Sequence, residues 1–270
     1  MVLDPLFIFG VGPFDGLGVS GAALATLLAN MVVTLLFIVK TKNAEIFSIR
    51  TKFDKAYLNE VLKMGLPISV QRVTFIVISI IIAKIIVDWG PDAIAVQRVG
   101  IQIESISYMT IGGLQGAIAA FFGQNYGAKK MNRIKNGYHI ALLLTAIFGM
   151  LISILFIAFP KEIFSIFLAD QTILNLGVNY MKIIGYSQIF MCLELMTVGA
   201  FNGIGKTYIP PIFSIILTGL RIPMAIILSG PFGLNGVWFS IAITSGLKGL
   251  ILVGWFLWSL NKMSNERRVQ

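Results

Sequence analysis

The sequence predicts an all-α membrane protein, a polytopic bundle of about seven transmembrane helices. Of its 270 residues, 57% are hydrophobic and only 12% are charged, whereas soluble domains carry about 25% charged residues. Several apolar runs also reach the roughly 20 residues that a helix needs to cross a bilayer. No run alternates in the manner of a barrel strand, so helices are the expected spanning elements.

Seven apolar runs are long enough to span a bilayer. They cover residues 18–39, 62–87, 94–122, 138–159, 174–200, 208–229 and 234–260. The second and third runs exceed the usual length, so these helices are expected to tilt or to protrude from the bilayer.

The basic residues of the chain concentrate in every second loop. They are Lys40, Lys42, Arg50, Lys52, Lys55 and Lys63 after the first span, Lys129, Lys130, Arg133 and Lys135 after the third, Lys206 after the fifth, and Lys262, Arg267 and Arg268 in the tail. This alternation explains the net charge of +9 as membrane topology, and not as nucleic-acid binding. The positive-inside rule predicts a multi-pass protein of the cell membrane with its N-terminus outside and its C-terminus in the cytoplasm.

Patterns of enzymatic chemistry are not found in the sequence, so we expect no enzyme, metal site or cofactor. His139 is the one histidine, and GIGKT (203–207) lacks the spacing of a phosphate-binding loop. Cys192 is the one cysteine, which excludes an intramolecular disulfide. The first ten residues have no basic region before the apolar stretch, so we do not expect a signal peptide.

A short turn sequence occurs twice. GPFDGLGV (12–19) returns as GPFGLNGV (230–237), and a gapless shift of 218 residues also aligns Pro5 with Pro223 and Thr26 with Thr244. Glycine and proline specify turn geometry, which apolar composition alone does not supply. Both copies face the same side, so the repeat is parallel, an architecture found in secondary transporters.

The repeat divides the chain into four parts. Residues 1–39 are the end of an N-terminal lobe, 40–60 a cytoplasmic linker, 61–260 a six-helix lobe, and 261–270 a cytoplasmic tail. The expected whole has twelve helices, so the opening helices of the first lobe are expected to be missing from this chain.

Several stretches resemble the multidrug and toxic compound extrusion (MATE) transporters. They are DPLFIFG (4–10), GVSGAALAT (18–26), MGLP (64–67), GQNYGAKK (123–130), GAFNGIGKT (199–207), RIPMA (221–225) and GLNGVWFSIAIT (233–244). The resemblance implies two six-helix lobes around a central cavity, and export of drug-like or cationic organic compounds in exchange for H⁺ or Na⁺. It also implies that the chain lacks the opening helices of the first lobe, including the helix whose acidic residue couples to ions in several members. Two partners for this lobe are left open, a separate chain that supplies the missing first lobe and another copy of this chain.

Two carboxylates inside predicted spans are the candidate ion-coupling residues, Glu104 and Glu194. Ionisable groups at bilayer depth cost about 2.5–3.5 kcal/mol on insertion scales, so they mark candidate sites. A carboxylate of this kind can take up H⁺ or, grouped with amide or hydroxyl oxygens, can hold Na⁺. The alternative for Glu104 is a structural ion pair with Arg98 or another base.

Further polar and sulfur-containing residues are expected to line the substrate cavity. Gln97, Glu104 and Tyr108 share one helix face, with Arg98 and Gln102 on an adjacent stripe. Met191, Glu194, Thr197 and Asn202 share a face of another helix. In some branches of the MATE family, the first and fourth helices of this lobe carry acids; here the first has Gln71 and Arg72 instead.

The sequence leaves several functions open. A MATE-like exporter is favoured, with the lipid bilayer and a small organic substrate as partners and no nucleic acid. A lipid-linked saccharide flippase has a similar architecture, a seven-helix receptor fits a simple count of spans, and a non-functional transporter remnant is a further alternative.

Overall fold

The computed structural model describes residues 3–11, 14–41, 55–167 and 170–266. The chain divides into two compact units, Met1–Lys55 and Ala56–Gln270, and each is described here by itself. Some residues used in the sequence analysis lie outside the described parts, namely Gly12, Pro13, Lys42, Arg50, Lys52, Arg267 and Arg268.

The first unit is a helical hairpin with a small antiparallel ladder at its turn. It contains α1 (Leu3–Phe9), β1 (Gly10–Val11), β2 (Phe14–Asp15) and α2 (Gly18–Thr41). Gly21 of α2 lies so close to the backbone carbonyl of Phe7 that a side chain would not fit there. The glycine therefore allows the two helices to pack in direct contact.

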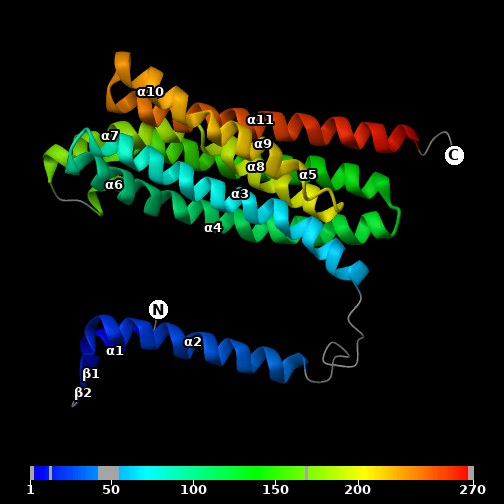
Figure 1. Cartoon of the computed structure of the whole chain (residues 1–270), viewed down its shortest axis with the longest axis horizontal. Helices are drawn as coiled ribbons and strands as arrows, with labels where there is room; N and C mark the ends of the chain where they lie inside the picture. The colour runs from blue at the N-terminus through cyan, green and yellow to red at the C-terminus, as the bar shows by residue number, and fades with distance from the viewer. Residues whose placement is uncertain (1–2, 12–13, 42–54, 168–169, 267–270) are drawn as a thin grey trace. The chain divides into compact units, whose positions relative to one another are not determined.

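The second unit is a bundle of nine described helices (Figure 1). They are α3 (Lys55–Val87), α4 (Pro91–Gly127), α5 (Met131–Ala158), α6 (Pro160–Ser165), α7 (Gln171–Gly185), α8 (Gln188–Gly203), α9 (Ile209–Gly219), α10 (Arg221–Phe232) and α11 (Leu234–Glu266). The short α6 lies between two spanning segments, and α9 with α10 makes up the apolar stretch Ile209–Phe232.

All seven predicted spans fall on helices, which confirms the predicted fold class. Six helices of the described chain are long and apolar enough to cross a membrane, and the pair α7–α8 makes a seventh if it is counted as one span. This pair differs from the straight span expected over 174–200, because it bends by 49° at Tyr186–Ser187. The Ser187 hydroxyl there donates a hydrogen bond to the Ile184 carbonyl (2.9 Å), in place of a continued helical ladder.

Helix α8 lies at the centre of the bundle, against α4, α5 and α11. Gly199 permits this, because a Cβ at that position would lie 2.5 Å from the carbonyl oxygen of Gln115 on α4. Buried aromatic rings fill the space beside it, with Phe122, Tyr138 and Phe256 in mutual contact. The helix that carries Glu194 is therefore held rigidly by its neighbours.

Helix α3 is attached to this bundle mainly through its second half. Ile78, Ile82 and Ile86 are buried and pack in one cluster with Ala225 and Val237. From Tyr57 to Val77, by contrast, none of the described side chains of α3 is buried. The first half of α3 therefore leaves room for cavities between itself and α4, α8 and α9.

The two copies of the repeated turn fold differently. The first forms the β1–β2 ladder before α2 begins at Gly18, whereas in the second α10 continues to Phe232 and α11 begins at Leu234. Gly233 makes the tighter second turn possible, because its φ of 58° lies in the left-handed region. Similar sequences therefore specify a turn at the same place without specifying its geometry.

Candidate functional site

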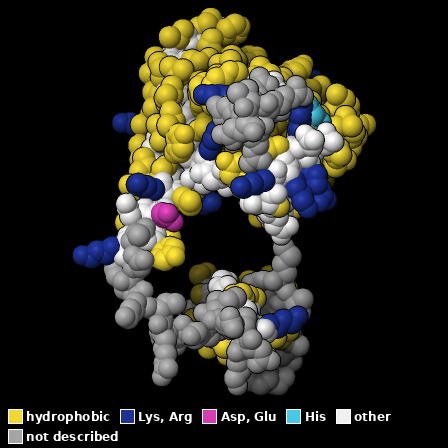
Figure 2. Space-filling model, turned by 90° about the vertical axis from the view of Figure 1, so that its right-hand side faces the viewer, with side chains coloured by type: hydrophobic (Ala, Val, Ile, Leu, Met, Phe, Trp, Pro, Cys, Tyr) yellow, Lys and Arg dark blue, Asp and Glu magenta, His cyan; other side chains and the backbone are white. Residues whose placement is uncertain are grey.

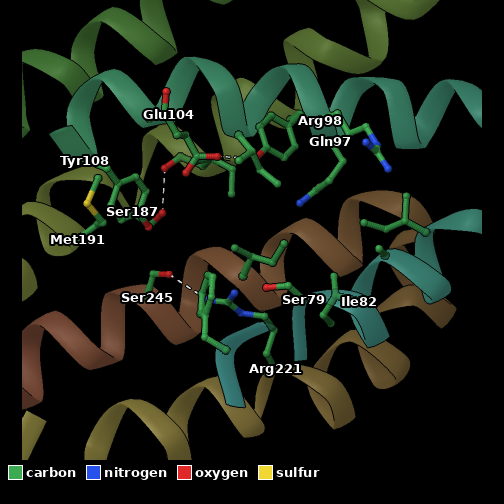
Figure 3. A pocket seen from close by; sticks show the side chains of 18 of the residues that line it. Ser79, Ile82, Gln97, Arg98, Glu104, Tyr108, Ser187, Met191, Arg221 and Ser245 are labelled. Carbon is green, nitrogen blue, oxygen red and sulfur yellow. Dashed lines mark hydrogen bonds between the residues drawn. The ribbon is translucent and has the colours of Figure 1, made fainter. Parts of the chain in front are cut away.

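The first of two adjacent cavities in the second unit has a volume of about 530 Å³ (Figure 3). It lies between α3, α4, α7, α8, α10 and α11, and its walls are mainly apolar and aromatic. A cavity of this size accommodates a drug-sized organic molecule. The bend between α7 and α8 contributes Ser187 and Gln188 to the wall, next to Met191.

Glu104 of α4 is held on one side of this cavity by uncharged hydrogen-bond donors. The Tyr180 hydroxyl donates to Oε1 (2.5 Å), and the Gln188 side-chain amide donates to Oε2 (3.3 Å). Among the residues that the structure describes, no Lys or Arg forms an ion pair with Glu104. The expected alternative, a pair with Arg98, is therefore wrong, and Arg98 lies exposed on the cavity lining.

Arg221 projects into the same cavity from the junction of α9 and α10. Its Nε donates a hydrogen bond to the Thr244 hydroxyl (3.2 Å), and its second terminal nitrogen donates to the Ser245 hydroxyl (3.3 Å). The residue is only 7% exposed. Figure 3 shows Arg221 on the wall opposite Glu104, so a buried positive charge and a half-buried negative charge face the cavity from different helices.

The second cavity, of about 420 Å³, contains the other candidate carboxylate. Glu194 of α8 accepts a salt bridge from the Lys248 ammonium of α11, with 3.1 Å between Nζ and Oε1. The Ser214 hydroxyl donates to the same oxygen at 3.4 Å. Both charged side chains are about nine-tenths buried, so this pair is largely shielded from solvent.

Three residues line both cavities, namely Phe75, Tyr108 and Lys248. The cavities are therefore neighbours along the bundle, with the ammonium of Lys248 at their junction. A movement of Lys248 away from Glu194 would therefore change the charge that faces each of the two cavities.

Eight of the ten predicted site residues line one or both of these cavities. Glu104, Gln97, Arg98, Tyr108 and Met191 line the first, and Glu194, Gln71, Asn202 and again Tyr108 line the second. The Gln97 side-chain carbonyl also accepts a hydrogen bond from the Trp238 indole (3.0 Å), which fixes that helix against α11.

Two predicted residues lie elsewhere. Gln102 of α4 is exposed and lines neither cavity. Thr197 is buried on the side of α8 that faces α5, where its hydroxyl is hydrogen-bonded to that of Tyr138 on α5 (3.0 Å). Sequence spacing placed Thr197 near Glu194, but its side chain is rotated by about 60° around the helix, which directs it into the core.

Several residues of the site were not predicted as such. Arg221 and Lys248 were visible in the sequence as ionisable residues inside spans, a signal that marks functional sites by default. Tyr180, Gln188 and Ser214 carry no comparable signal, because hydroxyl and amide residues are common on helices. Only the packing of α7, α8 and α9 brings them to the two carboxylates.

Basic side chains gather at one end of the second unit. Figure 2 views this end, where several Lys and Arg side chains and little acid are visible. Lys130 lies just before α5 and Arg133 in its first turn, while Lys206 lies between α8 and α9, next to Lys262 near the end of α11. The helices cross the bundle in alternating directions, which brings every second loop to this end.

The chain matches the family model described as MatE over residues 67–227. It is 27% identical over 277 residues to the "Probable multidrug resistance protein NorM" of Thermotoga maritima, covering 99% of this chain and 60% of that protein. It is 26% identical over 254 residues to the "Multidrug export protein MepA" of Staphylococcus aureus, covering 93% and 55%. The chain thus spans about 60% or less of the length of these relatives.

Solved structures show the same fold. A crystal structure of a MATE protein in its straight conformation superposes with a TM-score of 0.85 at 23% identity, covering 98% of this chain and 60% of that one. An outward-facing multidrug resistance MATE family transporter superposes with the same TM-score at 24% identity and the same coverage.

Apolar helices that can span a bilayer and these relatives together identify the chain as a membrane protein. The two relatives described above are named as a probable multidrug resistance protein and a multidrug export protein. With the MatE family model matching more than half of its residues, this chain belongs to the MATE transporter family.

Proposed function

We propose that this chain forms one lobe of a secondary active transporter. In this proposal it exports drug-like or cationic organic compounds in exchange for H⁺ or Na⁺. The observation that supports it is the placement of two carboxylates, the half-buried Glu104 and the buried Glu194, on two adjacent cavities of drug-sized volume. The names of the relatives, which refer to multidrug resistance and export, point to the same activity.

The ion-coupling role falls to Glu194. A coupling ion can drive a conformational change only if it binds one state more tightly than the other. In this structure the Lys248 ammonium neutralises Glu194 at 3.1 Å. An incoming H⁺ or Na⁺ at Glu194 would compete with Lys248, and the released ammonium would then alter both cavities that it lines.

The substrate-binding role falls to the first cavity, which Glu104 lines. Apolar side chains form most of its wall, and Met191 adds a flexible thioether that adapts to ligands of different shapes. Gln97, Tyr108 and the carboxylate of Glu104 provide the polar contacts. In this proposal a complementary six-helix lobe completes the transport pathway, and both lobes lie in the bilayer.

In this proposal the basic end of the bundle faces the cytoplasm. The positive-inside rule supports this orientation, since Lys130, Arg133, Lys206 and Lys262 gather at one end. Cys192→Ala combined with Asn132→Cys provides a single reporter at an exposed position in the first turn of α5, next to the connection from α4. A membrane-impermeant maleimide should label it only after the membrane is opened, and labelling in intact cells would reverse the orientation.

The efflux of a fluorescent organic cation tests the function. Drug-sensitive cells would express the chain together with a complementary six-helix lobe, and efflux of ethidium would be followed with and without an imposed H⁺ or Na⁺ gradient. Glu194→Gln should abolish gradient-driven efflux. Glu162→Gln is the matched control, because Glu162 is exposed on α6 and lines neither cavity. Undiminished efflux by Glu194→Gln would remove this residue from the mechanism.

A further inference from the structure

The first cavity presents one negative and one positive side chain on opposite walls, each held only by uncharged partners in the described structure. Glu104 accepts hydrogen bonds from Tyr180 and Gln188. Arg221 donates to the hydroxyls of Thr244 and Ser245. Neither charge is neutralised by direct contact with another protein side chain, unlike the pair of Glu194 and Lys248.

A buried charge is costly unless it is paired, and Arg221 is buried while Glu104 is half-buried. Here the two charges face each other across a cavity and do not touch (Figure 3). A ligand that carries a cationic group and an anionic group could pair with both at once. A ligand with only one charge would leave the other wall unpaired.

Gln188 provides a second, independent observation at the negative wall. Its residue is 1% exposed, and its side-chain nitrogen is already used in the bond to Glu104. Its side-chain oxygen, Oε1, is buried and has no hydrogen-bond partner among the described residues. An ammonium group of a ligand has several N–H donors, so it could bond to Glu104 and to this oxygen together.

We propose that the first cavity binds zwitterionic amphiphiles, with the ligand ammonium at Glu104 and Gln188 and the ligand carboxylate at Arg221. This inference rests on the proposed function, because it names the class of compound that the transport cavity takes. It narrows the broad expectation of drug-like or cationic compounds. The remaining charged residues of the lining fit this assignment, since Lys248 is paired with Glu194 and Arg98 lies exposed on the lining.

A matched set of three fluorescent probes tests the assignment on the purified full chain in detergent. Nε-dansyl-lysine carries an ammonium and a carboxylate, its methyl ester carries only the ammonium, and its Nα-acetyl derivative carries only the carboxylate. The dansyl group reports entry into an apolar cavity in each case. The chain should bind the zwitterion about 10-fold more tightly than either derivative, as expected for one more charged contact.

Two variants should each weaken the binding of a different pair of the three probes. Glu104→Gln should weaken binding of the zwitterion and of the ester by about 10-fold and leave the affinity for the Nα-acetyl derivative unchanged. Arg221→Gln should weaken binding of the zwitterion and of the Nα-acetyl derivative and leave the affinity for the ester unchanged. Arg221→Lys, which keeps the positive charge, should retain most of the affinity that Arg221→Gln loses. Lys182→Gln and Glu162→Gln are exposed controls outside both cavities and should change nothing.

The outcome is decisive even if a variant fails to fold, because the wild-type chain with three probes is sufficient. Equal affinity for the three probes would overturn the proposal, as would an equal loss for all probes in both variants. The proposed export function is tested independently of this binding proposal. Efflux could be lost while the two variants still weaken binding of different probes, since binding is measured without a gradient or a second lobe.

Discussion

The two candidate carboxylates, Glu104 and Glu194, lie on neighbouring cavities but have different partners. Glu194 is paired with Lys248 at 3.1 Å, so that its charge is balanced within the protein. Glu104 is bonded to the hydroxyl of Tyr180 and the amide of Gln188, which leave its charge unbalanced. The two sites therefore offer different chemistry, although the sequence presents both as single acids in apolar helices.

This difference separates two tasks that one site could hardly perform together. An internally neutralised carboxylate can exchange its own lysine for an ion, which suits coupling. A carboxylate held only by neutral donors keeps its charge available to a ligand. Experiments that remove one partner at a time should show the two sites responding differently.

The largest effect is expected from Lys248→Met, which leaves Glu194 buried without its cation. Breaking a buried ion pair from one side costs about 3–5 kcal/mol. The midpoint of thermal unfolding in detergent should fall accordingly. The double variant Glu194→Gln/Lys248→Met should recover most of the loss, because no unpaired charge remains. A single variant as stable as the wild type would show that the pair is not shielded.

Glu104→Gln should have a smaller effect on stability. It replaces two hydrogen bonds to a charged group with weaker bonds to an amide, and one such charged bond contributes about 1.5–3 kcal/mol. The same thermal measurement checks it, with Glu162→Gln as the exposed control. A loss larger than that of Lys248→Met would invert the comparison between the two sites.

Gly100→Ala should disturb the Glu104 site without touching Glu194. Gly100 lies against the ring of Tyr180, and a Cβ there would overlap the ring. Overpacking of this kind costs about 1–3 kcal/mol, and it would move the Tyr180 hydroxyl away from Glu104. Binding of an ammonium-bearing probe should change while ion-driven efflux persists. Loss of efflux alone would contradict the separation of tasks.

Tyr180→Phe should give the smallest change. It removes one donor from Glu104 but keeps the ring that packs edge-on against Trp238. The expected loss is about 1–2 kcal/mol in the free energy of unfolding. Affinity for the dansyl-lysine methyl ester should rise or stay equal, because the carboxylate becomes freer to pair with the ammonium. A large drop in that affinity would mean that Tyr180 positions Glu104 for binding.

Much of the fold could be predicted because apolar runs of spanning length have few alternatives. The runs 94–122 and 234–260 correspond to α4 and α11, with the structured helices extending several residues further. The bend within 174–200 could not be predicted, since neither proline nor an unusual run of glycines marks Tyr186–Ser187. Beside the bend, Gly185 packs closely against Phe156 and Ile157 of α5, a contact that the local sequence does not reveal.

The candidate site, like the fold, could be predicted only in part from the sequence. Glu104, Glu194 and the helix face of Gln97 and Tyr108 could be predicted, because an ionisable residue in a span is rare and costly. Thr197 and Gln102 could not be excluded, since helical spacing fixes angles around one helix but not which neighbour each angle faces. The partners Lys248 and Arg221 belong to other helices, far along the chain.

The sequence by itself determined that this chain is a bundle of membrane helices with a basic end and two acids inside it, because composition and spacing act locally along the chain. Only the tertiary structure decided that one acid meets a lysine 54 residues away while the other faces an arginine across a cavity. Long-range pairing depends on how whole helices pack, and close-packed interiors allow very few arrangements of a given set of side chains.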